Sequence, residues 1–287
     1  MQIELFFPEF FGLKSLWLKL LDEEKTYFNK NTVVKGIYGS FPNMKWNGGR
    51  VCLADSSPSY EEIEETFRVY KERDVNLTLC LTNMALKEEH YSDEYCNKIC
   101  EIASKYNASC NIVDNNFGKY LESKFPKLKQ NKSIIANYTK DTVDYNNYIV
   151  VNSKYNHDFE YLSSLEYKDR VVLHVTETCS LTCPRAPHYY AVSLAQLAGK
   201  QCDYDSPNCI YTEITQIKPK DVQKYLDIGI NKFKFDDRDL GDIYRTLYKC
   251  CEWLIQPEYV EIIFKKYLKY FNKNIKPKLS HKQGGSL

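Results

Sequence analysis

The sequence predicts an α/β chain that folds as a (β/α)8 barrel. Three observations support this prediction: eight short apolar runs along the chain, helical patterns after most of them, and a spacing that fits eight units into about 250 residues. The runs are continuously apolar, as expected of parallel strands that are buried on both faces. A doubly wound open sheet is the alternative. No GxGxxG or GxxxxGK[ST] segment follows a strand, so neither a dinucleotide site nor a P-loop is indicated.

The eight predicted strands are short runs of β-branched and aromatic residues bounded by turn residues. They are residues 3–7, 33–40, 76–81, 109–114, 133–138, 147–152, 170–175 and 232–237. The segment TKDTVDYN, between the fifth and sixth strands, is too short for a helix. We therefore expect that unit of the barrel to be degenerate.

Amphipathic helical patterns fill most of the gaps between these strands. They cover residues 59–73, 92–106, 117–125, 159–165 and 218–229. Ser59 and Glu62 form a capping box at the start of the first pattern. Pro219 and Gly229 stand where the first turn and the end of the last pattern are expected.

The domain organisation follows from these elements. We expect one barrel over residues 1–240, with a cysteine-rich insertion at about 176–217, between the seventh strand and the next helix. Residues 241–273 indicate a C-terminal helical extension, broken near Pro257. Residues 274–287 are typical of a disordered tail.

Composition and charge exclude several classes of function. The chain has 39 basic and 38 acidic residues, which gives no electrostatic reason to expect nucleic acid or an anionic membrane as a partner. The apolar N-terminus lacks a basic start and is interrupted by Glu4 and Lys14, so it is not a signal peptide. No stretch reaches the roughly 18 uncharged apolar residues of a membrane span. We expect a cytoplasmic protein, in which eleven cysteines favour metal binding or redox chemistry over disulfides.

Four of the cysteines, Cys179, Cys183, Cys202 and Cys209, lie within the predicted insertion. A loop of about 40 residues without its own core is uncommon unless something organises it. A metal bound by four thiolates would do so, because binding energy replaces the missing apolar burial. One C-x3-C pair with two separated cysteines favours an iron–sulfur cluster over zinc, whose cysteines usually form close pairs. Zinc and ordinary free thiols are the alternatives, and Cys52 is a reserve ligand.

Polar residues that follow the predicted strands should gather at the carboxyl rim of the barrel, where the active sites of such barrels lie. The candidates for substrate binding are Arg50, Asn83, Asp114, Asn152, Arg185, Asp236 and Arg238. Any one of them, taken singly, is more often a turn or capping residue. The arginines can clamp a carboxylate or phosphate bidentately, so we expect a small-molecule substrate, in particular an anionic one.

Two residues are candidates for proton transfer. Glu177 lies two residues before Cys179, the first cysteine of the cluster, and His188 has a side chain that ordinarily titrates near neutral pH. For His188 and Arg185, a structural role in holding the cysteine loop explains their presence nearly as well as a role in proton transfer or substrate binding does. No Ser/His/Asp or Cys/His set can be assembled from local sequence signals.

Two segments of the chain resemble the iron–sulfur collagenase-like peptidase family, whose relatives include the anaerobic ubiquinone-hydroxylation and tRNA-hydroxylation factors. The cysteine-containing element of that family is matched by Cys179, Cys183, Arg185 and Tyr189. A later element is matched by Asp221, Tyr225, Gly229, Ile230, Lys234 and Arg238.

The resemblance implies a 4Fe–4S cluster on the four cysteines and oxygen-independent hydroxylation or related redox chemistry in an anaerobic setting. It also leaves a collagenase-like hydrolase as an alternative. A further alternative is a non-catalytic iron–sulfur or zinc subunit that acts with a protein partner or electron donor.

Overall fold

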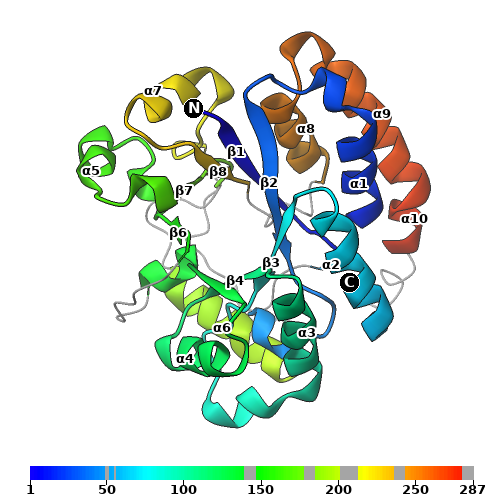
Figure 1. The fold of residues 1–287 in the computed structure, drawn as a ribbon, viewed down its shortest axis with the longest axis vertical. Coiled ribbons are helices and arrows are strands. Elements are labelled where there is room, and N and C mark those ends of the chain that lie inside the picture. Colours follow the sequence, from blue (N-terminus) through cyan, green and yellow to red (C-terminus); the bar gives the residue numbers. More distant parts are fainter. Residues whose placement is uncertain are drawn as a thin grey trace.

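The computed structural model describes residues 1–48, 52–54, 56–138, 147–177, 185–200, 213–235 and 243–279. Eight parallel strands form a closed barrel in which each strand pairs with the next one along the chain and β1 pairs with β8 (Figure 1). The strands are β1 (Ile3–Pro8), β2 (Thr32–Gly39), β3 (Asn76–Cys80), β4 (Ser109–Ile112), β5 (Lys129–Lys132), β6 (Ile149–Val150), β7 (Val171–His174) and β8 (Lys232–Lys234). The predicted (β/α)8 barrel is confirmed.

Helices surround the strands (Figure 1). The α-helices are α1 (Lys14–Glu23), α2 (Tyr60–Lys71), α3 (Glu94–Lys105), α4 (Asn115–Lys124), α5 (Phe159–Ser164), α6 (Arg185–Leu197), α7 (Val222–Asp227), α8 (Ile243–Leu254), α9 (Val260–Asn274) and α10 (Lys276–Leu279). Short 3-10 helices are η1 (Lys25–Tyr27), η2 (Lys45–Asn47), η3 (Glu88–Ser92), η4 (Ile134–Tyr138), η5 (Ser153–Tyr155), η6 (Lys168–Arg170), η7 (Pro219–Asp221) and η9 (Pro257–Tyr259). The capping box of Ser59 and Glu62 is present at the start of α2, as predicted. No helix of the described ranges is both long and apolar enough to cross a bilayer.

The main core lies between the strands and the helices. Because side chains alternate along a strand, the outward-facing residues of each strand pack against the helices. Phe7 of β1 shows this arrangement: its ring centroid lies 5.0 Å from that of Trp17 on α1 and 5.2 Å from that of Phe235. All three rings are buried. The inward-facing side of the same strands is polar in several places.

The predicted fifth strand was placed wrongly. Residues 133–138 were expected to form it, but β5 is Lys129–Lys132, which pairs with Ser109–Ile112 of β4. Residues Ile134–Tyr138 form the 3-10 helix η4. Ile134, Ile135 and Ala136 are buried in a small apolar cluster with Phe6 and Val113. The apolar character of this segment therefore reflects burial after the strand has ended.

The C-terminal helices complete the helical layer. Trp253 of α8 packs against Phe233 and Phe235, with centroid distances of 4.9 and 6.0 Å. Asn29, just before β2, donates two hydrogen bonds from its side chain to the carbonyls of Trp253 and Ile255. The predicted break near Pro257 is confirmed, because α8 ends at Leu254 and α9 begins at Val260. Most of the predicted tail, residues 280–287, lies outside the described residues.

Candidate functional site

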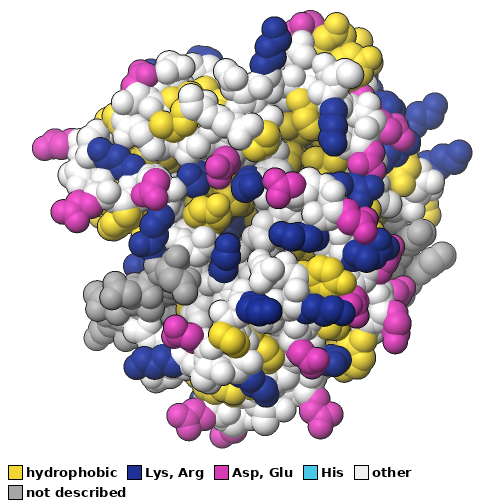
Figure 2. Space-filling view, viewed as in Figure 1, with side chains coloured by type: hydrophobic (Ala, Val, Ile, Leu, Met, Phe, Trp, Pro, Cys, Tyr) yellow, Lys and Arg dark blue, Asp and Glu magenta, His cyan; other side chains and the backbone are white. Residues whose placement is uncertain are grey.

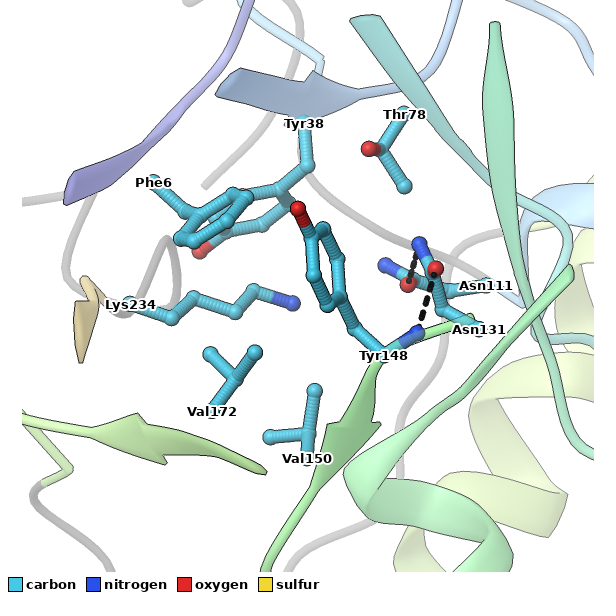
Figure 3. Close-up of a pocket in the computed structure, with 9 residues that line it drawn as sticks. All are labelled: Phe6, Tyr38, Thr78, Asn111, Asn131, Tyr148, Val150, Val172 and Lys234. Carbon is cyan, nitrogen blue, oxygen red and sulfur yellow. Dashed lines mark hydrogen bonds between the residues drawn. The ribbon is translucent and has the colours of Figure 1, made fainter. Parts of the chain in front are cut away.

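The barrel encloses a small central chamber. Its lining includes residues from all eight strands, together with Tyr148, which directly precedes β6. The lining residues are Phe6, Tyr38, Thr78, Asn111, Asn131, Tyr148, Val150, Val172 and Lys234 (Figure 3). A volume of about 20 Å³ leaves room for about one water molecule.

Lys234 places its side-chain nitrogen in this chamber. Its side chain is only 4% exposed, and Figure 3 shows it extending from β8 toward the middle of the barrel. The Lys234 Nζ lies 3.7 Å from the centroid of the Tyr38 ring, a cation–π contact in a desolvated setting. Tyr38 is fixed in turn, because its hydroxyl donates to the carbonyl of Phe235.

Buried amides line the side of the chamber formed by β4 and β5. Asn131 donates from Nδ2 to Asn111 Oδ1 at 3.2 Å and accepts at Oδ1 from Asn147 Nδ2 at 2.7 Å. Asn111 in turn donates to Cys80 Sγ at 3.7 Å. Interiors of such barrels are usually filled by branched aliphatic side chains. Here hydrogen-bonding groups line the chamber beside the apolar side chains of Phe6, Val150 and Val172.

One feature of the sequence indicates this chamber. Lys232 and Lys234 alternate with Phe233 and Phe235, and in a buried strand this alternation places the lysines on the inner side. The polar run Lys129–Lys132, which carries Asn131, has no strand signal of its own, so the sequence alone does not place Asn131 on the inner side of the barrel.

The two ends of the cysteine-rich segment are joined at the carboxyl end of β7. Thr215 Oγ1 donates to the carbonyl of Glu177 at 3.4 Å, and Ile217 N donates to the carbonyl of Val175 at 3.1 Å. The buried side chain of Asn156 donates from Nδ2 to the carbonyls of both His174 and Thr215, each at 2.7 Å. The chain therefore leaves and re-enters the barrel at one place on the rim.

The four predicted ligands, Cys179, Cys183, Cys202 and Cys209, lie outside the described residues.

Helix α6 lies inside the predicted insertion, which was expected to be a loop without a core of its own. It is held by loops of the barrel: Asn83 Nδ2 donates to the carbonyl of Ser193 at 3.2 Å, and Ser193 Oγ accepts from the backbone N–H of Met84 at 3.0 Å. Gln196 Nε2 also donates to the carbonyl of Met44 at 3.1 Å. Thus the segment between β7 and α7 is anchored both at β7 and at the loops that follow β2 and β3.

The two candidates for proton transfer occupy different parts of this arrangement. Glu177 is fully buried at the end of β7. His188 is half-buried on α6 and its ring stacks beside that of Tyr189, with centroids 6.2 Å apart. Tyr189 packs against the apolar cluster that contains Phe6 and Ile134. Both catalytic assignments remain predictions.

The described candidates for substrate binding make local structural bonds. Asp114 Oδ1 accepts from the N–H of Phe117 at 2.7 Å and caps α4, and Asn152 Oδ1 accepts from the N–H of Lys154 at 3.1 Å and caps η5. Asn83 holds α6, as described above. These are the capping and turn roles that such residues commonly have, and their contact with a substrate remains a prediction. Arg50, Asp236, Arg238 and the side chain of Arg185 lie outside the described residues.

Cys52, the reserve ligand, lies near Glu9. Its Sγ is 3.3 Å from the carbonyl oxygen of Ser40 and 3.9 Å from Glu9 Oε1. Burial, and then the negative charge of Glu9, raises the pKa of the Cys52 thiol, so the protonated form is favoured there. Among the described side chains, no group of three or more His, Cys, Asp or Glu residues could hold a metal ion.

Comparisons with known proteins give no close relative. No protein-family model matches the chain, and no curated protein matches it in sequence. A solved structure described as the U32 peptidase Mk0906 has a TM-score of 0.49 and 14% identity, covering 82% of this chain and 92% of that one.

Two further solved structures are more distant. The spore cortex-lytic enzyme SleL of Bacillus megaterium QM B1551 has a TM-score of 0.38 and 11% identity, covering 82% of this chain and 70% of that one. The N-acetylneuraminate lyase of Aliivibrio salmonicida has a TM-score of 0.33 and 10% identity, covering 98% of this chain and 79% of that one.

Proposed function

We propose that this chain is an iron–sulfur-dependent enzyme that acts on a small organic substrate at the carboxyl end of its barrel. The observation that carries the proposal is the junction of Glu177, Thr215 and Asn156, which brings both ends of a four-cysteine segment to one point of the rim. Active sites of (β/α)8 barrels lie at this end. Oxygen-independent hydroxylation, or related redox chemistry, is the proposed class of reaction.

Cys179, Cys183, Cys202 and Cys209 would hold a 4Fe–4S cluster through their thiolates. Such a cluster, when bound, supplies electron transfer or an open iron that acts as a Lewis acid. Helix α6 and its bonds to Asn83 and Met84 would position the segment over the rim. Glu177 is buried, lies two residues before Cys179 in the sequence, and is the proposed group that takes up and releases a proton.

The polar groups of the barrel interior favour a polar or anionic substrate that binds at the rim above them. The Lys234 ammonium group and the amides of Asn111 and Asn131 lie in the chamber below the carboxyl rim. A buried ammonium group attracts an anion more strongly than an exposed one, because the surroundings screen it less. Arg50, Arg185 and Arg238 are proposed to clamp the same substrate at the rim.

The proposal is tested by metal analysis of protein purified without oxygen. Iron, acid-labile sulfide and zinc should be measured in the wild type and in Cys179→Ala and Cys209→Ala. Both variants should lose iron and sulfide together. Cys110→Ala is the matched control, because Cys110 is a fully buried cysteine of β4 that packs in the core, and it should keep the wild-type metal content.

Other outcomes would contradict the proposal in different ways. A colourless wild-type protein with one zinc per chain would exclude the iron–sulfur enzyme. Retention of iron in Cys209→Ala together with loss of iron in Cys52→Ala would replace Cys209 by Cys52 as a ligand. Equal iron content in all of these variants would show that the thiols do not bind it.

A further inference from the structure

A second cavity lies at the amino end of the barrel, opposite the cysteine-rich segment. It has a volume of about 450 Å³ and is formed by the amino ends of β2 to β5, the end of α2 and the residues before β6. We propose that this cavity binds a small organic phosphate, a phosphate monoester attached to a ring such as a nucleoside. This site is independent of the iron–sulfur proposal.

The charge of the cavity favours an anion. Lys35, Lys71 and Lys129 line it together with a single acidic residue, Asp74, so three positive charges and one negative charge leave a net charge of +2. Lys35 Nζ lies 3.7 Å from Asp74 Oδ2. Lys71 and Lys129 form no ion pair with any described residue. Lys and Arg side chains gather near the middle of the face in view in Figure 2.

A simpler explanation for lysines at this end is that they offset the negative ends of helix dipoles. Lys71 is in the last turn of α2 and fits that explanation. Lys35 and Lys129 do not, because they belong to strands β2 and β5. The ends of α2 and α3 contribute about half an elementary charge each, about −1 in total, and this does not cancel the +2 of the side chains.

The floor of the cavity suits a ring. Tyr148 and Phe6 form it, with their rings in a T-shaped contact at 5.3 Å, and this pair separates the cavity from the central chamber. The T-shaped contact with Phe6 holds the Tyr148 ring, and the Tyr148 backbone N–H donates a hydrogen bond to Asn131 Oδ1. An aromatic face that is held in place can stack against a base or pack against a sugar.

The walls supply hydrogen-bonding groups with defined positions. Asn76 Nδ2 donates to Ser109 Oγ at 2.8 Å, and Asn147 Nδ2 bonds both Asn131 and Ser109. A volume of about 450 Å³ lies within the range of small-molecule sites, roughly 300–1,000 Å³. Inorganic phosphate alone would leave most of this space empty, so we infer that the ligand carries an organic part.

Adenosine 5′-monophosphate is a suitable probe, with inorganic phosphate and adenosine as comparisons. Calorimetric titration of the full chain should show that the monophosphate binds more tightly than either comparison compound. Lys71→Glu and Lys129→Glu should each weaken its binding by about tenfold or more, since each replaces an attractive charge by a repulsive one. Lys269→Glu is the matched control, because Lys269 is an exposed lysine of the outer helix α9 and should bind as the wild type does.

Tyr148→Leu tests the contribution of the organic part of the ligand separately from that of the phosphate. It should weaken binding of the monophosphate and leave that of inorganic phosphate unchanged. No measurable binding of the monophosphate, or equal binding by the three lysine variants, would overturn the proposal. Equal affinity for inorganic phosphate and the monophosphate would overturn the inference of an organic part.

Discussion

The side-chain nitrogen of Lys234 lies 3.7 Å from the centroid of the Tyr38 ring, inside a barrel whose chamber has room for about one water molecule. Burying an ammonium group is costly unless it is compensated, so this contact marks a part of the interior that is not simply filled with apolar side chains. Lys232, two residues earlier on β8, is also buried.

The first prediction concerns the accessibility of these two lysines. When the native protein is treated with a lysine-acylating reagent, Lys232 and Lys234 should react at least about tenfold more slowly than exposed lysines, because the reagent needs an opening of the barrel. Peptide mass spectrometry at several times would measure the rates, with denatured protein as the control in which all lysines react alike. Fast modification of Lys234 in native protein would show that the chamber is open.

The second prediction concerns the junction at the rim. Asn156→Ala removes the donor to the carbonyls of His174 and Thr215 and leaves both in a buried setting. We expect a loss of about 2–4 kcal/mol in the free energy of unfolding, measured with urea. Asn116→Ala, at an exposed position of α4, should change it by less than about 0.5 kcal/mol. A loss in Asn156→Ala no larger than that of the control would mean that the junction does not stabilise the fold.

The third prediction compares two glycines with positive φ. Gly48 has φ +70°, and a Cβ there would lie 2.6 Å from the carbonyl oxygen of Thr82. Gly199 has φ +63°, but a Cβ there would have no atom within 4 Å. Gly199→Ala should therefore cost only the backbone strain of about 1 kcal/mol, and Gly48→Ala should cost at least about 1 kcal/mol more. Thermal unfolding of both variants tests which of them loses more stability. Equal losses of stability would contradict the steric explanation.

The fourth prediction concerns pH. Burial acts to raise the pKa of Asp93, but the hydrogen bond from the N–H of Cys96 and the Lys45 ammonium group outweigh it and lower that pKa. A lowered pKa in the folded state means that the ionised carboxylate stabilises the protein at pH above about 4, and that this stabilisation is lost as pH falls through the folded pKa.

Asp93→Asn keeps a capping oxygen at the start of α3 but removes the charge. The difference in free energy of unfolding between wild type and Asp93→Asn should therefore be constant near neutral pH and should shrink as the solution becomes more acidic. Urea unfolding at several pH values measures it. A stability difference that grows toward low pH would contradict the lowered pKa of Asp93 in the folded state.

The fold was largely predictable because most strands carry their own signal. The segment KFKF combines lysines with phenylalanines that are buried against the helices, and RVVLHV is continuously apolar. Lys129–Lys132 has no such signal, and it forms β5 because its neighbours β4 and β6 require a partner to close the barrel. At Lys129–Lys132, pairing with the neighbouring strands outweighed the low strand propensity of the segment. The more apolar residues 133–138, which follow it, were therefore taken as the strand.

The site was less predictable than the fold. Polar residues after strands were expected to meet a substrate, yet Asp114 and Asn152 cap helices, and sequence alone does not distinguish the two roles. The interior amides and Lys234 were missed as site residues because their significance depends on which side of each strand faces inward. Helix α6 was missed because its hydrogen bonds join it to loops more than 100 residues away, such as that between Asn83 and Ser193.

The pairing of β1 with β8 has a consequence for the order in which the protein can fold. Phe6 of β1 pairs with Lys234 of β8, and the first and last strands of the sheet are separated by most of the chain. During synthesis, one edge of β1 stays unpaired until β8 has emerged from the ribosome. An unpaired strand edge promotes association with other chains. We therefore expect folding to be slow, and the nascent chain to depend on chaperones until its last quarter has been made.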